Sequence, residues 1–217
     1  MESCCRMEQR SEGASEVFTR QSKRYARKFK RRGLERVQKL MLAGVRAEQV
    51  EGKEVLDIGC GVGALHLTLL QEGAARSTGI DVSEGMIDHA RTLAGTLGVG
   101  SRAEYVVGDF VEKAAEVQEA DITILDKFIC CYEDPETLIE ASTAKTKKLY
   151  ALSHPKENLM MEFIFKSQIA MAKLFRWKFH PFWHDWKRIR ENIQRRGFAL
   201  VYSGATPMWQ VLVYRRQ

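Results

Sequence analysis

The sequence has few prolines and no long hydrophobic run. Four of its 217 residues are proline, and its most apolar stretch, residues 159–175, is interrupted by Glu162, Lys166 and Lys173. A helix that spans a bilayer needs about 20 consecutive, predominantly apolar residues, so this stretch is too polar to span one. The first ten residues are charged and do not resemble a secretory signal. We therefore expect a cytoplasmic protein.

Cysteine is scarce, and its positions do not suit structural cross-links. The five cysteines form two adjacent pairs plus Cys60, which is no plausible disulfide framework. Cys4 and Cys5 lack the two-residue spacing and the companion pair of a zinc site, so no metal is expected. Cys130 and Cys131 have no preceding Pro or Thr of the kind that nucleophilic cysteines have in enzymes acting on pyrimidine C5. We interpret them as buried or cleft-lining thiols.

The size and composition of the chain are those of an ordinary globular protein. Hydrophobic residues make up 45% of the sequence, and 217 residues are enough to bury a sizeable core. No internal repeat or low-complexity tract is visible. We expect a flexible segment over residues 1–16 and a single domain over residues 17–217.

Two short motifs indicate a nucleotide-binding site. Residues 55–63 (VLDIGCGVG) join a short apolar run, typical of a buried parallel strand, to three glycines, Gly59, Gly61 and Gly63. Glycines let the chain turn tightly and bring its backbone close to a ligand. The next apolar run, residues 77–82, contains Asp81 about twenty residues beyond the glycines, where a carboxylate at a strand end accepts the hydroxyls of a ribose.

The segments DIGCGVG and GIDVS resemble the first two motifs of the class I S-adenosylmethionine (SAM) methyltransferases. Asp57 precedes the first glycine, as in that family, and the chain lacks the G-x-G-x-x-G at the start of the domain that NAD enzymes use. The resemblance implies that Asp57 organises the loop near the amino-acid part of SAM and that Asp81 binds its ribose. The other cofactor contacts expected from these motifs are Gly59, Cys60, Gly61, Gly63, Val82 and Met86. A dehydrogenase or a Rossmann-like domain without a cofactor is the alternative.

Residues 108–110 (GDF) follow a β-prone run, where the family places an acid that binds the adenine amino group. Asp109 is the candidate for that bond, and Phe110 is the candidate for the apolar wall beside the adenine. The alternative is a solvated Asp in a strand-to-helix turn.

Residues 121–128 (DITILDKF) predict a central strand that ends at Asp126. The resemblance of this run to the family's fourth motif places Asp126 and Lys127 beside the methionine part of SAM and its methyl group. We expect Asp126 to contact the cofactor, and Lys127, Cys131 and Tyr132 to contact the methyl acceptor.

The remaining segments predict an α/β fold with a Rossmann-like, seven-stranded sheet. A fifth strand is expected at residues 148–153, and residues 197–203 and 209–214 are expected to form a hairpin. This is the class I methyltransferase arrangement, in which the last strand is antiparallel to the others. Residues 17–46 are expected to form lid helices, and residues 157–196 a helical cap.

Positive charge is concentrated in two segments. Residues 17–40 contain ten Lys or Arg and one acidic residue. Residues 165–196 contain nine Lys or Arg and two acidic residues. The net charge of the whole chain is +6, so the remainder is acidic. The second segment interleaves aromatics with cations, which suits RNA, an anionic membrane or an apolar substrate pocket. Its candidate membrane anchors are Trp177, Phe179, Phe182, Trp183 and Trp186.

The first basic segment contains a spacing found in SAM methyltransferases that resemble the ubiquinone and menaquinone biosynthetic enzymes. Phe18, Ser22 and Tyr25 reproduce F-x-x-x-A-x-x-Y, with Ser in place of Ala. The resemblance implies that Tyr25 closes over the cofactor. An amphipathic helix packed on the core is the alternative.

The sequence LDKFICCYEDPETLI, followed by SHPKENL and a later H-x-x-x-x-I, resembles the magnesium-protoporphyrin O-methyltransferases. This resemblance implies that His154 and His184 face the substrate, where an imidazole accepts a hydroxyl proton or steadies a carboxylate. Hydrogen-bonded structural histidines are the alternative. His180 and His184 have helical spacing, but Pro181 between them argues against a metal pair.

The predicted function is direct transfer of the SAM methyl group to a small molecule that is lipophilic or acidic. The chain lacks the [DN]-P-P-[YF] motif, which argues against methylation of an adenine amino group or a protein glutamine. An RNA-modifying enzyme and a non-catalytic SAM-binding regulator are the alternatives. The expected partners are the small-molecule acceptor and, at the periphery, an anionic membrane, whereas nucleic acid is less favoured.

Overall fold

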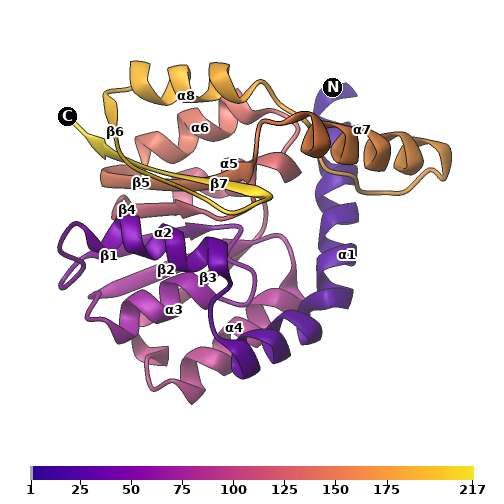
Figure 1. Cartoon of the computed structure of the whole chain (residues 1–217). Coiled ribbons are helices and arrows are strands. Elements are labelled where there is room, and N and C mark those ends of the chain that lie inside the picture. The colour runs from indigo at the N-terminus through magenta and orange to yellow at the C-terminus, as the bar shows by residue number, and fades with distance from the viewer. Residues whose placement is uncertain (1) are drawn as a thin grey trace.

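A computed structural model describes the backbone of residues 2–217 and the side chains of residues 12–217. Seven strands form one sheet in the order β3-β2-β1-β4-β5-β7-β6 (Figure 1). The parallel strands on the N-terminal side are β1 (Glu54–Ile58), β2 (Arg76–Asp81), β3 (Ala103–Val107), β4 (Ala120–Leu125) and β5 (Thr146–Pro155). β7 (Trp209–Arg216) runs antiparallel to both β5 and β6 (Phe198–Ala205). The predicted seven-stranded α/β sheet with an antiparallel last strand is confirmed.

Helices cover both faces of the sheet (Figure 1). The hydrophobic cluster on one face includes residues of α2 (Arg36–Arg46), α3 (Ala64–Gln71) and α4 (Glu84–Thr96). The cluster on the other face includes residues of α5 (Phe110–Lys113), α6 (Pro135–Ala144), α7 (Leu159–Leu174) and α8 (Trp186–Arg195). Three short 3-10 turns complete the elements, η1 (Gly100–Arg102), η2 (Ala114–Glu116) and η3 (Ile129–Cys131).

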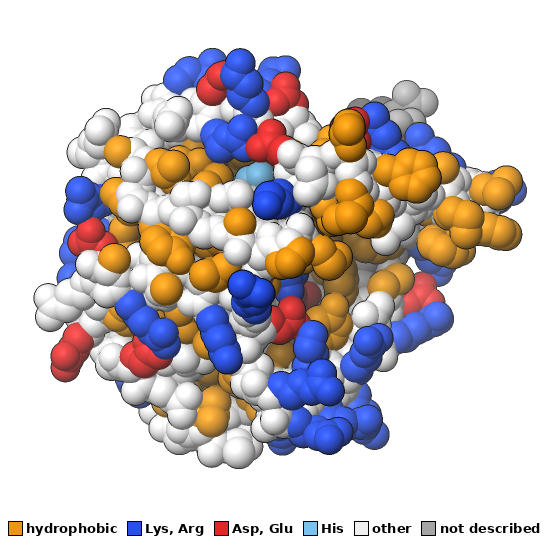
Figure 2. Space-filling view, viewed as in Figure 1, with side chains coloured by type: hydrophobic (Ala, Val, Ile, Leu, Met, Phe, Trp, Pro, Cys, Tyr) orange, Lys and Arg blue, Asp and Glu red, His pale blue; other side chains and the backbone are white. Residues whose placement is uncertain are grey.

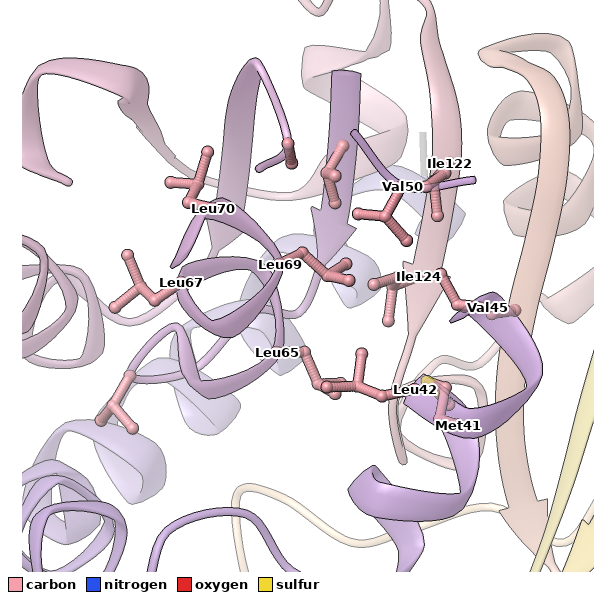
Figure 3. Packing of buried hydrophobic residues seen from close by; sticks show 14 of the residues in the cluster. Met41, Leu42, Val45, Val50, Leu65, Leu67, Leu69, Leu70, Ile122 and Ile124 are labelled. Carbon is pink, nitrogen blue, oxygen red and sulfur yellow. The ribbon is translucent and has the colours of Figure 1, made fainter. Parts of the chain in front are cut away.

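The alternation of side chains along β1 divides the core into these two clusters. Val55 packs with the helices on one face, whereas Leu56 and Ile58 pack on the other, because successive side chains of a strand point to opposite sides. Figure 3 shows apolar residues of α2 and α3 pointing toward Ile122 and Ile124 of β4. Burying a Leu or Ile side chain contributes about 1.5–3 kcal/mol, so this packing holds the glycine loop between β1 and α3 at a fixed place.

The N-terminal helix packs on the helical layer of the sheet. The long helix α1 (Glu2–Arg32) packs on α4 and ends at Gly33, whose φ of 64° is the left-handed conformation that glycine adopts easily. Residues 2–16, expected as part of a flexible segment, continue α1 as helix, and the proposed division of the chain into segments stays a prediction.

The segment expected as a cap has two parts with different contacts. α7 projects to the side of the molecule past α1 (Figure 1). α8 packs instead against α6 and β6, so it belongs to the helical layer on the sheet. Among the described residues, no helix has both the length and the apolar character needed to span a bilayer.

Candidate active site

A cavity of about 330 Å³ lies at the carboxyl ends of the parallel strands. Its walls come from α1, from the segments that follow β1, β2, β3 and β4, and from residues 177–182 after α7. In open α/β sheets, ligands bind in this crevice because the strand ends and the helix N-termini meet there. The cavity is therefore the candidate site.

The glycine loop after β1 forms one wall of the cavity and suits close contact with a ligand. Gly59 and Gly61 have φ angles of 69° and 54°, a region that L side chains rarely adopt. A Cβ at Gly61 would meet only the Met86 Sδ, 4.0 Å away, whereas a Cβ at Gly59 would lie 2.2 Å from the Phe128 ring. The backbone at Gly61 thus faces open space, and Gly59 allows Phe128 to pack against the loop.

Asp81, at the end of β2, lines the cavity beside the glycine loop. The backbone N–H of Gly61 donates to one carboxylate oxygen at 2.9 Å, and the N–H of Ser83 donates to the other at 2.9 Å. Each oxygen keeps a further lone pair for an additional donor. Burial raises the pKa of Asp81 to about 6, against the lowering effect of these two hydrogen bonds.

This raised pKa predicts a pH-dependent affinity for a ligand that donates hydroxyls to Asp81. Above pH 7 the carboxylate accepts them, but as the pH falls through about 6 it becomes protonated and loses acceptor capacity. We therefore expect the Kd for SAM to rise at acidic pH, by up to about tenfold per unit. Titration of the wild type and of Asp81→Asn over this range checks the prediction, since the rise should be much smaller in the variant. An equal rise in both would contradict it.

Asp57 belongs to a buried hydrogen-bonded chain that the sequence analysis missed. Its Oδ2 lies 2.8 Å from the Nδ1 of His66, and the Nε2 of His66 lies 3.3 Å from the Tyr105 hydroxyl. The side chains of Asp57 and His66 are 3% and 0% exposed. A consistent proton arrangement has Tyr105 donating to His66 and His66 donating to Asp57. The sequence signal was a lone His in the apolar run of α3.

Asp109 connects the segment after β3 with the segment after β4. Its Oδ1 accepts the backbone N–H of Val111 at 2.8 Å, which caps α5, and the Tyr132 hydroxyl at 3.0 Å. Burial and the neighbouring Asp109 hold the pKa of Tyr132 well above its usual value, so the phenol keeps its proton. Both residues line the cavity, and the adenine contact of Asp109 stays a prediction.

Asp126 and Lys127 connect the end of β4 to the N-terminal end of α2. Asp126 accepts the Gln38 side-chain amide at 3.1 Å and the Ser153 hydroxyl at 2.7 Å, and burial raises its pKa. The Lys127 ammonium lies 2.7 Å from Glu35. Burial opposes the charge of Lys127, but Asp126 and Glu35 outweigh it and raise its pKa. Lys127 is thus already paired with a carboxylate at the cavity wall.

Most of the predicted site residues line this cavity. They are Tyr25, Asp57, Gly59, Cys60, Gly61, Asp81, Val82, Met86, Asp109, Asp126, Lys127, Cys131 and Tyr132. Gly63 and Phe110 are not among the described lining residues. Gly63, with a φ of 82°, turns the chain into α3, and Phe110 is 1% exposed in the core.

His154 does not face the cavity as the resemblance implied. It is 1% exposed, donates from Nδ1 to the Pro155 carbonyl at 2.8 Å, and stacks on Trp186 with ring centroids 4.6 Å apart. Burial lowers its pKa to about 4. The physical reason is strand alternation, because the preceding Ser153 points to Asp126 and the next side chain must point to the other face.

His184 also lies outside the described cavity wall. Its Nε2–H donates to the carbonyls of Ile129 and Tyr132, at 3.1 and 2.9 Å. Burial lowers the pKa of His184. These two hydrogen bonds hold the backbone of the turn at residues 129–132. His184 thus has a structural role next to Tyr132.

The cavity is also lined by aromatic residues and by His180, which the sequence analysis considered only as a metal ligand. The aromatic residues in this wall are Phe18, Trp177, Phe179 and Phe182. Phe18 packs edge-on against Phe179, with ring centroids 5.5 Å apart. The Nδ1–H of His180 donates to the Pro181 carbonyl at 3.0 Å, which leaves Nε2 as the ring nitrogen with a free lone pair. No group of three or more potential ligands for a metal occurs among the described residues.

One family model matches the central part of the chain. Residues 55–147, from β1 into β5, match a family model described as a methyltransferase domain. This part of the chain is therefore similar to a methyltransferase domain. This confirms the resemblance to class I methyltransferases that the motifs indicated.

Solved methyltransferases share the fold of this chain. The magnesium protoporphyrin IX methyltransferase of Synechocystis, solved with bound S-adenosylhomocysteine (SAH), aligns with a TM-score of 0.67 and 24% identity, over 83% of this chain and 82% of that one. A putative sarcosine dimethylglycine methyltransferase from Galdieria sulphuraria aligns with a TM-score of 0.66 and 10% identity, over 84% of this chain and 86% of that one.

Two curated relatives match the chain over shorter stretches than the solved structures do. A ubiquinone biosynthesis O-methyltransferase from Vibrio vulnificus is 32% identical over 103 residues, which are 47% of this chain and 43% of that protein. A ribosomal protein L11 methyltransferase from Enterobacter sp. is 37% identical over 76 residues, 35% of this chain and 25% of that protein. The chain thus matches less than half of the length of either relative.

Proposed function

We propose that the chain transfers a methyl group from SAM to a small acceptor with an apolar or aromatic body. The observation that carries this proposal is the continuity of the cavity. It runs from the glycine loop and Asp81 to the aromatic wall of Phe18, Phe179 and Phe182. One end suits an adenosine-containing ligand, and the other suits an apolar molecule.

The charges around the cavity support SAM as the ligand. The carboxylates of Asp57, Asp81 and Asp126 line it, and SAM carries a sulfonium and an ammonium group that carboxylates complement. The open space at Gly61 allows the backbone to approach a bound molecule. The residues present therefore fit SAM, with Asp81 as the acceptor for the ribose hydroxyls and the glycine loop beside the amino-acid part.

SAM supplies an electrophilic methyl group when bound, so the chain needs mainly to bind, to orient and to exclude water. Phe18 and Phe179 provide flat apolar surfaces against which an acceptor packs. The free Nε2 of His180 takes the proton of an acceptor that has one to lose, such as a hydroxyl. A carboxylate or thiolate acceptor needs no such base.

An acceptor panel tests the proposed function. The full chain is incubated with SAM and with hydroxyl, thiol, amine and carboxylate derivatives of one aromatic scaffold, and SAH release is measured. We expect SAH release that depends on the acceptor and favours one class. SAM binding without acceptor-dependent release across a broad set of scaffolds would contradict the proposal and favour a non-catalytic SAM-binding protein.

A further inference from the structure

Helix α7 and the residues just after it expose an apolar surface. Leu159 is 85% exposed, Phe163 and Leu174 are each 74% exposed, and Phe175 and Trp177 are 59% and 56% exposed. We call this set, together with Met160 and Met171, the α7 surface. Figure 2 shows its hydrophobic side chains protruding at the right of the molecule. Soluble monomers rarely expose a contiguous apolar patch of this kind unless it contacts something.

Cations surround the α7 surface. Lys166, Lys173, Arg176 and Lys178 are exposed within residues 159–178. Glu162 is the only acid in this stretch, and it pairs with Lys166 at 2.6 Å.

Helix α1 adds a second group of cations. Residues 17–32 of α1 contain eight Lys or Arg and no acid, and we call them the basic strip. Figure 2 shows Lys and Arg side chains gathered below the protruding apolar group, on the same side of the molecule.

Helix α1 and the end of the α7 surface are joined by direct contacts. The Lys178 ammonium lies 2.8 Å from Glu16. A Cβ at Gly13 would lie 2.6 Å from the Lys178 carbonyl oxygen, so the two segments are in close contact. Phe179, the next residue, packs on Phe18 of α1. The basic strip and the α7 surface are therefore held in a fixed relation.

From this arrangement we infer that the α7 surface and the basic strip dock the chain on an anionic membrane. Apolar side chains with a cationic surround match the interface of a bilayer, where the apolar groups enter the acyl boundary and the cations meet acidic headgroups. A second copy of the chain fits less well, because its docking on the α7 surface would bring two sets of cations together. Charge complementarity thus favours lipid over self-association.

The residues that would enter the membrane differ from those expected from the sequence. Trp186 is 2% exposed, Trp183 packs partly buried against the core, and Phe179 and Phe182 line the cavity. Of the five expected anchors, only Trp177 belongs to the α7 surface. Trp177 also lines the cavity, so the docked face adjoins the cavity. If the proposed function holds, this gives a lipophilic acceptor a short route from the membrane.

Vesicle co-sedimentation of the full chain tests the inference. Vesicles of phosphatidylcholine alone are compared with vesicles that also contain phosphatidylglycerol, at low and high salt. We expect binding to the anionic vesicles only, with loss at high salt. Lys23→Glu/Arg27→Glu should lower the partition coefficient by at least about fivefold per cation, and Phe163→Ser/Leu174→Ser should lower it by at least tenfold.

The matched control is Leu200→Ser/Val201→Ser, which removes two apolar side chains, 44% and 41% exposed, from strand β6. This control should bind like the wild type. Equal pelleting with neutral and anionic vesicles, or full binding by Phe163→Ser/Leu174→Ser, would overturn the inference. RNA binding without vesicle binding would assign the basic strip to nucleic acid, and a dimer lost only in Phe163→Ser/Leu174→Ser would assign the α7 surface to a second copy. Sedimentation needs neither SAM nor acceptor, so its failure leaves the proposed methyl transfer standing.

Discussion

Replacing Asp81 with alanine is expected to weaken SAM binding by about 1–3 kcal/mol, because the ribose hydroxyls lose a charged acceptor. This corresponds to a rise in Kd of roughly 5-fold to 150-fold. Calorimetric titration of the purified variants with SAM measures the change. The same substitution also removes the acceptor for the N–H groups of Gly61 and Ser83, so the melting temperature is recorded in parallel.

Two controls distinguish the loss of the ribose contact from a change in the glycine loop that Asp81 also holds. Asp88→Ala removes an exposed carboxylate of the neighbouring helix α4 that pairs only with Arg91 among the described residues, and it should leave the Kd unchanged. An SAH analogue without the 2′-hydroxyl should bind the wild type more weakly than SAH does, but should bind Asp81→Ala about as well as SAH does. An Asp81→Ala Kd equal to that of the wild type would remove the assignment of the ribose site.

Replacing His180 with alanine is expected to lower kcat for a hydroxyl acceptor by about 10²–10⁴-fold. In the proposed function, the Nε2 of His180 in the cavity wall takes the proton of the acceptor hydroxyl, and the alanine variant lacks this base. The Kd for SAM should not change, because the predicted cofactor contacts lie at the other end of the cavity. Steady-state kinetics with the acceptor found in the panel measures the effect.

His184→Ala is the matched histidine control. His184 donates to the backbone carbonyls of Ile129 and Tyr132, so its loss should lower the melting temperature and should lower kcat far less than His180→Ala does. For a carboxylate acceptor, His180→Ala should have little effect, since no proton has to leave. Wild-type kcat for a hydroxyl acceptor in His180→Ala would show that the base is elsewhere or is not required.

The meeting of the expected cofactor-binding residues in one cavity could be predicted from the sequence, because these residues lie at strand ends. Asp57, Asp81, Asp109 and Asp126 each lie at or just after the carboxyl end of a parallel strand. Parallel strands place those ends at one edge of the sheet, so residues far apart in the chain meet without any knowledge of the packing. The antiparallel last strand was expected from the resemblance to class I methyltransferases, whereas the order of the strands comes from the structure.

The aromatic part of the cavity wall could not be predicted in the same way. His180 and Phe182 lie in residues 177–185, which have no regular secondary structure, so no periodicity fixes the direction of their side chains. The direction of the His154 side chain could have been predicted, because strand alternation puts it on the face opposite to Ser153. The ion pair between Glu35 and Lys127 joins residues 92 apart and depends on how α2 docks. No local pattern in the sequence signals it.

A crystal structure of the chain with SAH tests the central claim most directly. The account predicts that the ribose hydroxyls lie within hydrogen-bonding distance of Asp81, that the homocysteine part lies beside the backbone of Gly59 and Gly61, and that the sulfur faces the part of the cavity lined by Phe18 and Phe179. SAH bound elsewhere, or bound in the cavity with its ribose away from Asp81, would contradict it.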